Sequence, residues 1–258
     1  MQQVTNKKAF VTGGSRGIGR GIIRMLSDSG YDTAFTYNSY EDEAVTLKEE
    51  VEKKGRKCFF YQASLQNPGV AESITARAIE DLSGIDLLVC NAGRTRHNDL
   101  LHLEDELIDF LYNLNYRSYL FCAKIAANDM VSRNVKGNII FIASTRGFRA
   151  YPEDAVYGGL KAALIRSAES IALDLAPHGI RVNCIAPGAT ANRGSFTMEE
   201  LSSGHMAKKI PLGRKGSPDE VGRLVCFIAS GDADYMTGNT IKLDGGLILP
   251  GTPEKEIK

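Results

Sequence analysis

Short apolar runs and longer amphipathic segments alternate along most of the chain. We predict a strand in each apolar run, over residues 9–11, 33–37, 58–61, 85–90, 138–143, 181–185 and 240–243. The segments between them carry apolar residues at helical spacing, which predicts helices over 20–26, 43–54, 70–82, 104–130, 157–176 and 218–229. Residues 113–115 are where the longest of these helices would break. This alternation predicts an α/β fold, a single doubly wound parallel sheet of about seven strands with helices on both faces.

We expect one domain over residues 1–258. A chain of 258 residues suits one large α/β domain or two small ones, and no repeat or Pro/Ser-rich linker divides it. The irregular stretch from Gly188 to Gly216 is too long for an ordinary connection. We interpret it as a substrate lid.

Composition narrows the functional classes. Lys+Arg and Asp+Glu balance at 31 each, so no global field favours nucleic acid or an anionic membrane surface. Residues 1–8 lack the apolar core of a signal peptide, and no apolar run approaches the length of a membrane span. The five cysteines are widely spread and never form Cys-x2-Cys, which predicts free thiols, not disulfides or metal ligands. We therefore expect a cytoplasmic protein.

A glycine-rich turn lies between the first predicted strand and the first helix, within Val11–Gly19. Strand, glycine turn and helix are typical of the opening of a Rossmann-type dinucleotide-binding unit. Gly13 would permit the tight turn, Gly17 the approach of a pyrophosphate, and Gly19 close packing of helix on strand. The spacing is Gly-x3-Gly-x-Gly, so a glycine-rich turn in some other α/β protein is the alternative.

Tyr157 and Lys161 stand four residues apart, on one face of a predicted helix. A nearby positive charge favours phenolate, so we expect the pKa of Tyr157 to lie below its usual value of about 10. The alternative is an exposed tyrosine and lysine that merely share a surface. Ser144, Asn91–Gly93 and Pro187–Gly188 each follow a predicted strand, where ligands bind in open α/β sheets.

These motifs, together with Asn115, stand in the order and spacing of the short-chain dehydrogenase/reductases, which the chain resembles from about Lys7 to Gly246. The resemblance implies that Tyr157 is the general acid in carbonyl reduction and the general base in alcohol oxidation. It implies that Ser144 polarises the substrate oxygen, Lys161 binds the nicotinamide ribose and Asn115 relays protons. No metal is expected, because the four histidines, His97, His102, His178 and His205, show no ligand spacing.

We expect NADP(H) as the cofactor. NAD sites place an acidic residue about twenty residues past the glycines, where this chain has Tyr37-Asn38-Ser39, and Asp32 lies too early. Arg16 could cover a 2′-phosphate; alternatively Glu41 or Asp42 reaches the ribose. The full set of expected cofactor contacts is Thr12, Gly13, Ser15, Arg16, Gly17, Ile18, Gly19, Tyr37, Asn38, Ser39, Ser64, Leu65, Asn91, Ala92, Gly93, Tyr157, Lys161, Pro187 and Gly188.

Two features depart from the family pattern. Ser64 stands where members commonly carry an Asp that bonds the adenine, so adenine affinity is in question. Gly158-Gly159 lies inside a predicted helix, at a cost of about 1 kcal/mol per glycine relative to alanine. We expect close approach of another backbone or of the cofactor there; poor local helicity is the alternative.

The substrate is less well defined. Residues 134–138 and 175–183 resemble the glucose 1-dehydrogenase branch, which makes a sugar a candidate. The 3-oxoacyl-carrier-protein reductases tend to carry Arg at the positions where this chain has Asn138 and His178, so a reductase of that type is a less favoured alternative. A hydroxysteroid-type dehydrogenase is a further alternative. A non-catalytic dinucleotide-sensing protein is the alternative from a different class, but it should lack one of the three catalytic side chains.

Five arginines flank the predicted site: Arg94, Arg96, Arg146, Arg149 and Arg193. Arginine forks bind carboxylate and phosphate in two-point fashion, which would favour an anionic substrate. The alternative is that most of them pair with Glu153, Asp154 or Glu199, or point into solvent.

The family usually forms homotetramers, with dimer faces on the helices over 104–130 and 157–176. The apolar segment Leu247–Pro250 would be left partly wet in a monomer. We therefore expect a homotetramer that acts on a small carbonyl or alcohol, without a nucleic-acid or membrane partner.

Overall fold

Seven parallel strands form the centre of the molecule, in the order β3-β2-β1-β4-β5-β6-β7. The computed structural model describes residues 7–192 and 196–249. The strands are β1 (Lys8–Val11), β2 (Asp32–Tyr37), β3 (Cys58–Gln62), β4 (Leu87–Cys90), β5 (Asn138–Ile142), β6 (Arg181–Pro187) and β7 (Thr240–Leu243). All seven lie where the apolar runs predicted strands. Five of them, β1, β2, β4, β5 and β6, are almost wholly buried, as expected for strands covered on both faces.

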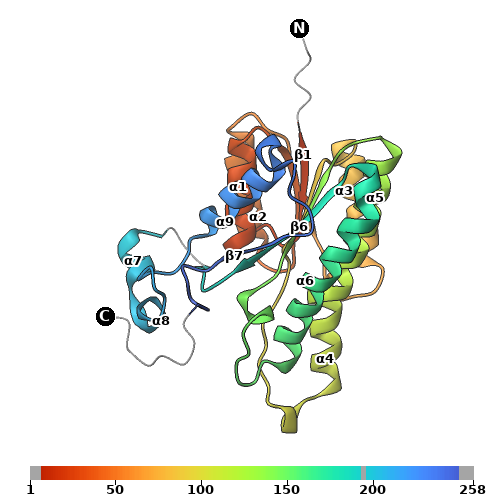
Figure 1. Ribbon diagram of the computed structural model, residues 1–258. Coiled ribbons are helices and arrows are strands. Elements are labelled where there is room, and N and C mark those ends of the chain that lie inside the picture. The colour runs from red at the N-terminus through yellow and green to blue at the C-terminus, as the bar shows by residue number, and fades with distance from the viewer. Residues whose placement is uncertain (1–6, 193–195, 250–258) are drawn as a thin grey trace.

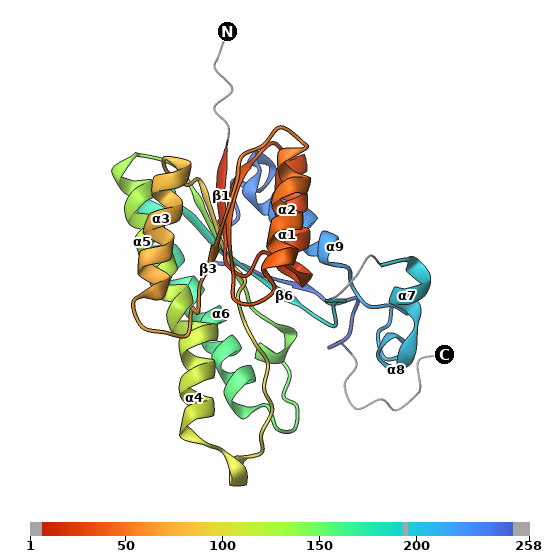
Figure 2. The ribbon, with the colours of Figure 1, turned by 180° about the vertical axis from the view of Figure 1, so that it is seen from behind.

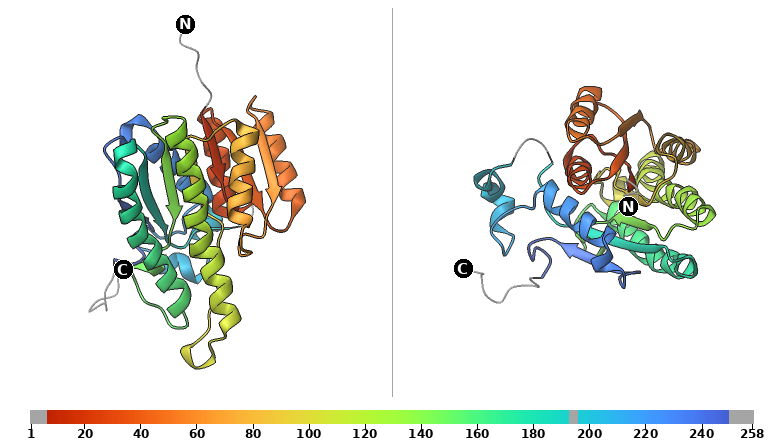
Figure 3. Two further views of the ribbon diagram at one scale, coloured as in Figure 1. Left: turned by 90° about the vertical axis from the view of Figure 1, so that its right-hand side faces the viewer. Right: turned by 90° about the horizontal axis from the view of Figure 1, so that it is seen from above.

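Helices cover both faces of the sheet, so the predicted fold class is confirmed. The longer helices are α1 (Gly17–Asp28), α2 (Glu41–Glu52), α3 (Val70–Leu82), α4 (Asp105–Tyr112), α5 (Ser118–Ser132), α6 (Ala155–Leu175) and α9 (Pro218–Ala229). Figures 1 and 3 show α1, α2 and α9 on one face and α3, α5 and α6 on the other. Each face has its own cluster of buried apolar side chains against the sheet.

The predicted break in the longest helix is present as a π-helical turn over Asn113–Arg117, between α4 and α5. The stretch interpreted as a lid is less irregular than the sequence predicted, because it forms two short helices, α7 (Met198–Ser202) and α8 (Gly204–Lys208). A capping box between Thr197 and Glu200 starts α7, and Leu201 buries its side chain beneath it. These local signals are too short to stand out in the sequence.

The order of the strands determines where a ligand can enter. β1 pairs with β2 on one side and with β4 on the other, so the strand order reverses direction between β1 and β4. Ligands of open α/β sheets bind at such a switch point, beyond the carboxyl ends of the strands. In Figures 1 and 2, α4 and the loop before α6 extend past this edge, on the side opposite the N-terminus. No helix in the described part of the chain is long and apolar enough to cross a membrane.

Candidate active site

The glycine turn leaves the first turn of α1 open. Gly13 and Gly17 have φ values of +67° and +53°, which glycine adopts without strain. Arg16 precedes α1 in an extended conformation, and no described side chain caps the helix. The N–H groups of the first turn and the positive end of the helix dipole are therefore available to an anion.

Asn91 fixes the shape of this turn. Its side-chain amide donates hydrogen bonds to the carbonyl oxygens of Thr12 and Gly13, at 2.9 Å each. The Thr12 hydroxyl accepts in turn from the backbone N–H groups of Asn91 and Ala92, at 2.9 and 3.0 Å. A Cβ on Gly19 would lie 2.1 Å from the Gly13 oxygen and 2.7 Å from the Asn91 amide nitrogen. The close packing predicted at Gly19 is thus present.

A cavity of about 630 Å³ extends from the glycine turn to the ends of β4, β5 and β6. All the expected cofactor residues line it except Thr12, which is buried behind the turn, and Ser64. The Ser64 hydroxyl donates to the side-chain oxygen of Asn38 at 2.9 Å, so it holds the end of β2. Every charged side chain on the described lining is cationic: Arg16, Arg94, Arg96 and Lys161.

The end of β2 carries no carboxylate into the cavity. Asn38 and Ser39 line it together with Arg16, whose guanidinium lies 4.7 Å above the ring of Tyr40. Asp32 lies at the other end of the strand, where it accepts from the backbone N–H of Lys57 at 2.9 Å. The expectation that Asp32 lies too early is confirmed.

Tyr157 lies on the cavity wall with hydroxyl partners on two other segments. Side-chain hydrogen bonds from Ser144 and Thr95 act to lower its pKa, but burial, which disfavours phenolate, outweighs them and leaves the pKa raised. The expectation of a lowered pKa is therefore wrong in this structure. Thr95 was not singled out from the sequence, although it stands two residues past Gly93 and so follows the same strand.

Lys161 is almost completely buried, at 2% exposure. Its ammonium donates to the backbone oxygen of Ile142 at 3.0 Å and to the Tyr119 hydroxyl at 3.4 Å. It lies 5.7 Å from the centre of the Tyr157 ring. Desolvation lowers the pKa of Lys161 to about 7, which weakens the cation on which the prediction for Tyr157 relied. Sequence reasoning missed Tyr119, because only the α5 helix brings it beneath the lysine.

Asn115 is fully buried in the π-helical turn, behind the cavity wall. Its amide nitrogen donates to the backbone oxygens of Leu111 and Arg94, at 3.1 Å each. Its side-chain oxygen accepts from the N–H of Arg94 at 3.2 Å. Asn115 thereby joins the α4–α5 break to the chain that follows β4. Ser144, Tyr157 and Lys161 line the cavity; Asn115 supports it from behind.

The five arginines do not share one role. Arg146 forms an ion pair with Asp154, Nη1 to Oδ2, at 3.0 Å, which is the alternative the sequence left open. Arg149 lies 6.0 Å from the Tyr151 ring, away from the cavity lining. Arg94 and Arg96 do line the cavity, and the Arg96 guanidinium lies 4.5 Å above the ring of Phe110. Arg193 falls outside the described residues.

The two helical glycines near Tyr157 differ. A Cβ on Gly158 would lie 3.0 Å from an Asp154 carboxylate oxygen and 3.1 Å from the backbone oxygen of Arg146. The predicted close approach is thus present at Gly158, and the approaching groups belong to the loop before α6. A Cβ on Gly159 would meet no atom of the described residues within 4 Å. Packing within the described part of this chain therefore does not require glycine at 159.

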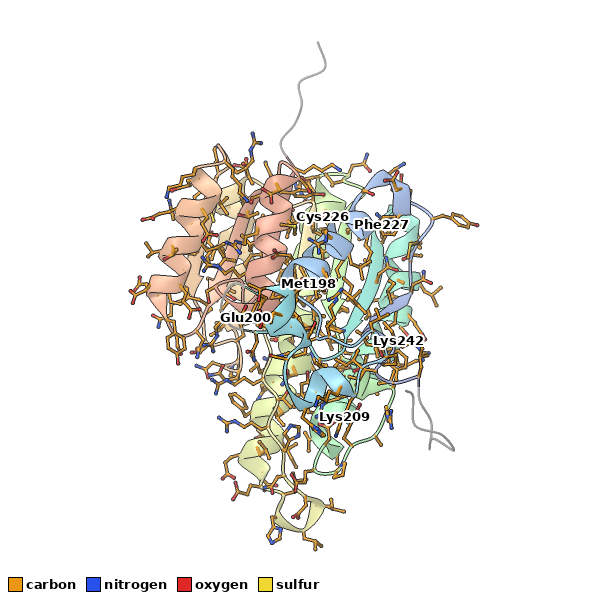
Figure 4. The ribbon with its side chains drawn as sticks, turned by 90° about the vertical axis from the view of Figure 1, so that its left-hand side faces the viewer. Met198, Glu200, Lys209, Cys226, Phe227 and Lys242 are labelled. Atoms are coloured by element: carbon orange, nitrogen blue, oxygen red, sulfur yellow. The ribbon has the colours of Figure 1, made fainter. Side chains whose placement is uncertain are left out.

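The lid segment begins at the mouth of the site, and its two helices stand away from the body of the protein. Figure 1 shows α7 and α8 apart from α9 and the sheet, and Figure 4, viewed from the side on which they stand, labels Met198 and Glu200 on α7 and Lys209 just after α8. Gly188 and Asn192, at the start of the segment, line the cavity. The segment therefore begins at the site and returns to the body of the protein at α9.

An ion pair secures that return. Both guanidinium Nη atoms of Arg214 donate to Glu220 in the first turn of α9, at 2.6 and 3.0 Å. The backbone N–H of Ser217 also donates to this carboxylate, at 2.7 Å.

Comparisons with known proteins agree with this geometry. The family profile described as Enoyl-(Acyl carrier protein) reductase matches residues 13–248. The chain is 33% identical over 244 residues to the 3-oxoacyl-[acyl-carrier-protein] reductase FabG of Staphylococcus epidermidis, covering 95% of this chain and 100% of that protein. It is 34% identical over 259 residues to the oxidoreductase UcpA of Salmonella typhimurium, covering 97% of each.

Solved structures extend the comparison. The acetoin dehydrogenase YohF of Salmonella typhimurium superposes with a TM-score of 0.93 at 29% identity, over 98% of this chain and 100% of that one. The acetoin dehydrogenase of Enterobacter cloacae gives a TM-score of 0.91 at 31% identity, over 98% of this chain and 100% of the other.

Proposed function

Because the chain belongs to the short-chain dehydrogenase/reductase family of oxidoreductases, we propose that it transfers a hydride between NADP(H) and a carbonyl or secondary-alcohol substrate. The observation that carries this proposal is that Ser144, Tyr157 and Lys161 line the same cavity as the glycine turn. A cavity with this lining suits a dinucleotide beside a proton donor.

Tyr157 is the proposed general acid and base. In reduction its hydroxyl gives a proton to the developing alkoxide, and in oxidation its phenolate takes the proton back. Ser144 holds the substrate oxygen with a hydroxyl that lines the same cavity as Tyr157. Thr95 offers a second hydroxyl beside them. Because burial favours the protonated phenol, the proton-donating form of Tyr157 predominates at neutral pH.

Lys161 and Asn115 have supporting roles in this proposal. Lys161 is held by hydrogen bonds to Ile142 and Tyr119 at the inner end of the cavity. There it binds ribose hydroxyls, and its protonated form favours the phenolate of Tyr157. Asn115 keeps the chain after β4 in register and relays protons toward solvent.

The residues present fit NADP(H). When bound, the nicotinamide supplies or accepts the hydride. The open first turn of α1 suits the pyrophosphate, and Arg16, Asn38 and Ser39 suit a 2′-phosphate because no carboxylate lies on the described lining. Neither of the alternative ribose ligands, Glu41 and Asp42, is on the described lining of the cavity. The remaining expected contacts, including Ser64, are part of the same proposal.

The substrate is proposed to be a small carbonyl compound, with a sugar retained as a candidate from the sequence. Reduction of a 3-oxoacyl thioester is the second candidate, favoured by the 33% identity to FabG. The argument from Asn138 and His178 against it loses force. Asn138 is buried at the first residue of β5 and His178 ends a turn before β6, both at the edge of the sheet opposite Tyr157.

We also propose a single catalytic domain over residues 1–258 with a substrate lid at about 188–216, assembled as a homotetramer in the cytoplasm. Leu249 is 76% exposed, as an apolar segment awaiting a partner would be. All five cysteines are free thiols, which suits a reducing compartment. A measured mass of one chain at micromolar concentration would refute the tetramer.

Turnover tests the proposed function directly. The purified protein is assayed with NADPH and with NADH against ketones, aldehydes, sugars and a 3-oxoacyl thioester. We expect NADPH oxidation with at least one carbonyl class, and a kcat/KM for NADPH at least about tenfold above that for NADH. Tight NADPH binding without turnover of any compound would favour the dinucleotide-sensing alternative.

A further inference from the structure

An ion pair with a buried carboxylate lies next to Tyr157, outside the cavity lining. The Asp154 side chain is 2% exposed and comes immediately before α6, three residues ahead of Tyr157. The Arg146 guanidinium is 3.0 Å from one of its oxygens, and the imidazole of His97 is 3.7 Å from the other. None of these three side chains is part of the described cavity lining.

This pair lacks the hydrogen bonds that usually accompany a buried charge. Neither Asp154 oxygen has a hydrogen-bond partner among the described residues, and Arg146 Nη1 has none either. A buried carboxylate with no hydrogen bond adds little to stability, because its desolvation is not repaid. The placement of the pair therefore calls for another reason.

Both members belong to the segments that hold the reacting hydroxyls. The N–H of Arg146 donates to the Ser144 hydroxyl oxygen at 3.2 Å. The backbone oxygen of Asp154 accepts from the N–H of Gly158 at 3.0 Å, in the first turn of the helix that carries Tyr157. Gly158 has no side chain to separate the Asp154 carboxylate from the Arg146 backbone.

The two charges act on Tyr157 in opposite directions. The carboxylate of Asp154 disfavours phenolate and raises the pKa of Tyr157, whereas the guanidinium of Arg146 lowers it. The other groups that face the phenol are the hydroxyls of Thr95 and Ser144 and, farther away, the Lys161 ammonium. The Asp154 carboxylate itself faces Arg146 from the preceding loop and His97 from the loop after β4.

We propose that Arg146 and Asp154 are a positioning pair for the proton-transfer step: together they clamp the Ser144 loop to the start of α6 and cancel each other's charge at the Tyr157 hydroxyl. Arg146 is on this basis a cation that does not read the substrate, and Asp154 is its counter-charge. The inference rests on the proposed role of Tyr157.

The decisive variant is Asp154→Asn, because it leaves a guanidinium that stays protonated at any accessible pH. We expect the pKa of Tyr157 to fall by about one unit in this variant. The double variant Arg146→Met/Asp154→Asn removes both charges, and we expect the pKa to return to within about 0.3 units of the parent. Arg146→Lys keeps the charge and should titrate like the parent.

The readout is the ultraviolet absorbance of tyrosinate as a function of pH, as the difference between each protein and the same protein carrying Tyr157→Phe. This titration needs no substrate, so it works whether or not the substrate has been identified. The alkaline limb of kcat in the oxidising direction should move with it. Asp129→Asn, in an Arg–Asp pair at the far edge of the sheet, is the matched control and should leave the Tyr157 titration unchanged.

An unchanged Tyr157 titration in Asp154→Asn would overturn the inference, as would a double variant that keeps the shift of the single one. Failure of the proposed function is distinguishable from this. If Tyr157→Phe turns over normally, the acid/base assignment is wrong; if it is inactive while Asp154→Asn titrates like the parent, only the positioning pair is wrong.

Discussion

Two arginine–aspartate pairs lie at opposite edges of the same sheet and are built differently. At the edge where strands begin, Asp129 accepts from Arg133 at 2.7 to 3.1 Å and from the N–H of Ile85 at 3.0 Å. At the edge where strands end, Asp154 faces Arg146 at 3.0 Å with no hydrogen bond among the described residues. The two arginine side chains are equally exposed, at 30%.

The two pairs have the same residue types and differ in how many hydrogen bonds the carboxylate accepts. The pair at the beginning edge ties the end of α5 to the chain entering β4, and its fully bonded carboxylate contributes to stability. The pair at the ending edge holds a carboxylate that is more deeply buried, 2% against 12% exposed, yet less satisfied. An arginine–aspartate pair thus stabilises the fold at one edge, and a second pair of the same residue types adjusts the electrostatics of Tyr157 at the other.

The largest expected effect is on catalysis at the edge where the strands end. Replacing Tyr157 by Phe removes the proposed proton donor, so kcat should fall by about a hundredfold or more with little change in cofactor affinity. Tyr31→Phe, a buried tyrosine just before β2 at the beginning edge, is the control. Steady-state kinetics of both variants decides, and near-normal turnover by Tyr157→Phe would contradict the assignment.

Removing an arginine tests the beginning edge. Arg133→Met leaves the Asp129 carboxylate without its strongest donor, so the free energy of unfolding should fall by about 2–3 kcal/mol. Its kcat at a permissive temperature should match that of the parent, because no cavity residue is touched. Urea unfolding and a single kinetic assay measure the two quantities. A larger effect on kcat than on stability would reverse the roles assigned to the two edges.

A third ion pair, Arg214–Glu220, has a fully hydrogen-bonded carboxylate like that of Asp129 but lies near the site. Glu220 lies beside the lid, and hydrogen bonds from Arg214 lower its pKa from 4.5 to about 2. Its stabilising contribution is therefore complete above pH 4.5 and is lost as the pH falls through about 2. Glu220→Gln should remove roughly 2 kcal/mol of stability at neutral pH and flatten the acid limb of the unfolding curve. An acid limb as steep as in the parent would mean that the pair contributes nothing.

The smallest expected effect concerns Arg16, which we propose binds the 2′-phosphate of NADPH. Arg16→Gln should lower kcat/KM for NADPH by about tenfold and leave kcat/KM for NADH nearly unchanged, because only the former carries a 2′-phosphate. Arg77→Gln is the matched control, because Arg77 also lies over a tyrosine ring, that of Tyr61, but does not line the cavity. Equal losses with both cofactors would remove Arg16 from the 2′-phosphate site.

The contrast also marks what the sequence can predict. Strand positions and the convergence of Ser144, Tyr157 and Lys161 follow from periodicity and from parallel topology, which brings strand ends to one edge. The sign of the Tyr157 shift did not follow, because it depends on burial. Spacing cannot report that quantity.

Contacts between distant segments were also beyond the sequence. Tyr119 meets Lys161 only through the packing of α5 on the sheet, and Thr95 meets Tyr157 only through the path of the loop after β4. The pairing of Arg146 with Asp154 could be anticipated as one alternative, since both lie in the loop that leads into α6. Its lack of hydrogen bonds could not.

The π-helical turn at Asn113–Arg117 has a consequence for chain length. A π turn holds one residue more than an α turn, and one residue rotates a helix by about 100°. The Asn115 amide nitrogen donates to the oxygen of Leu111, four residues earlier, and so supplies a partner to that carbonyl. Deleting one residue here would restore a continuous α-helix but put either Asn115 or the apolar face of α5 out of phase. The extra residue of the π turn therefore keeps two things in phase at once: Asn115 with the site, and the apolar face of α5 with the core.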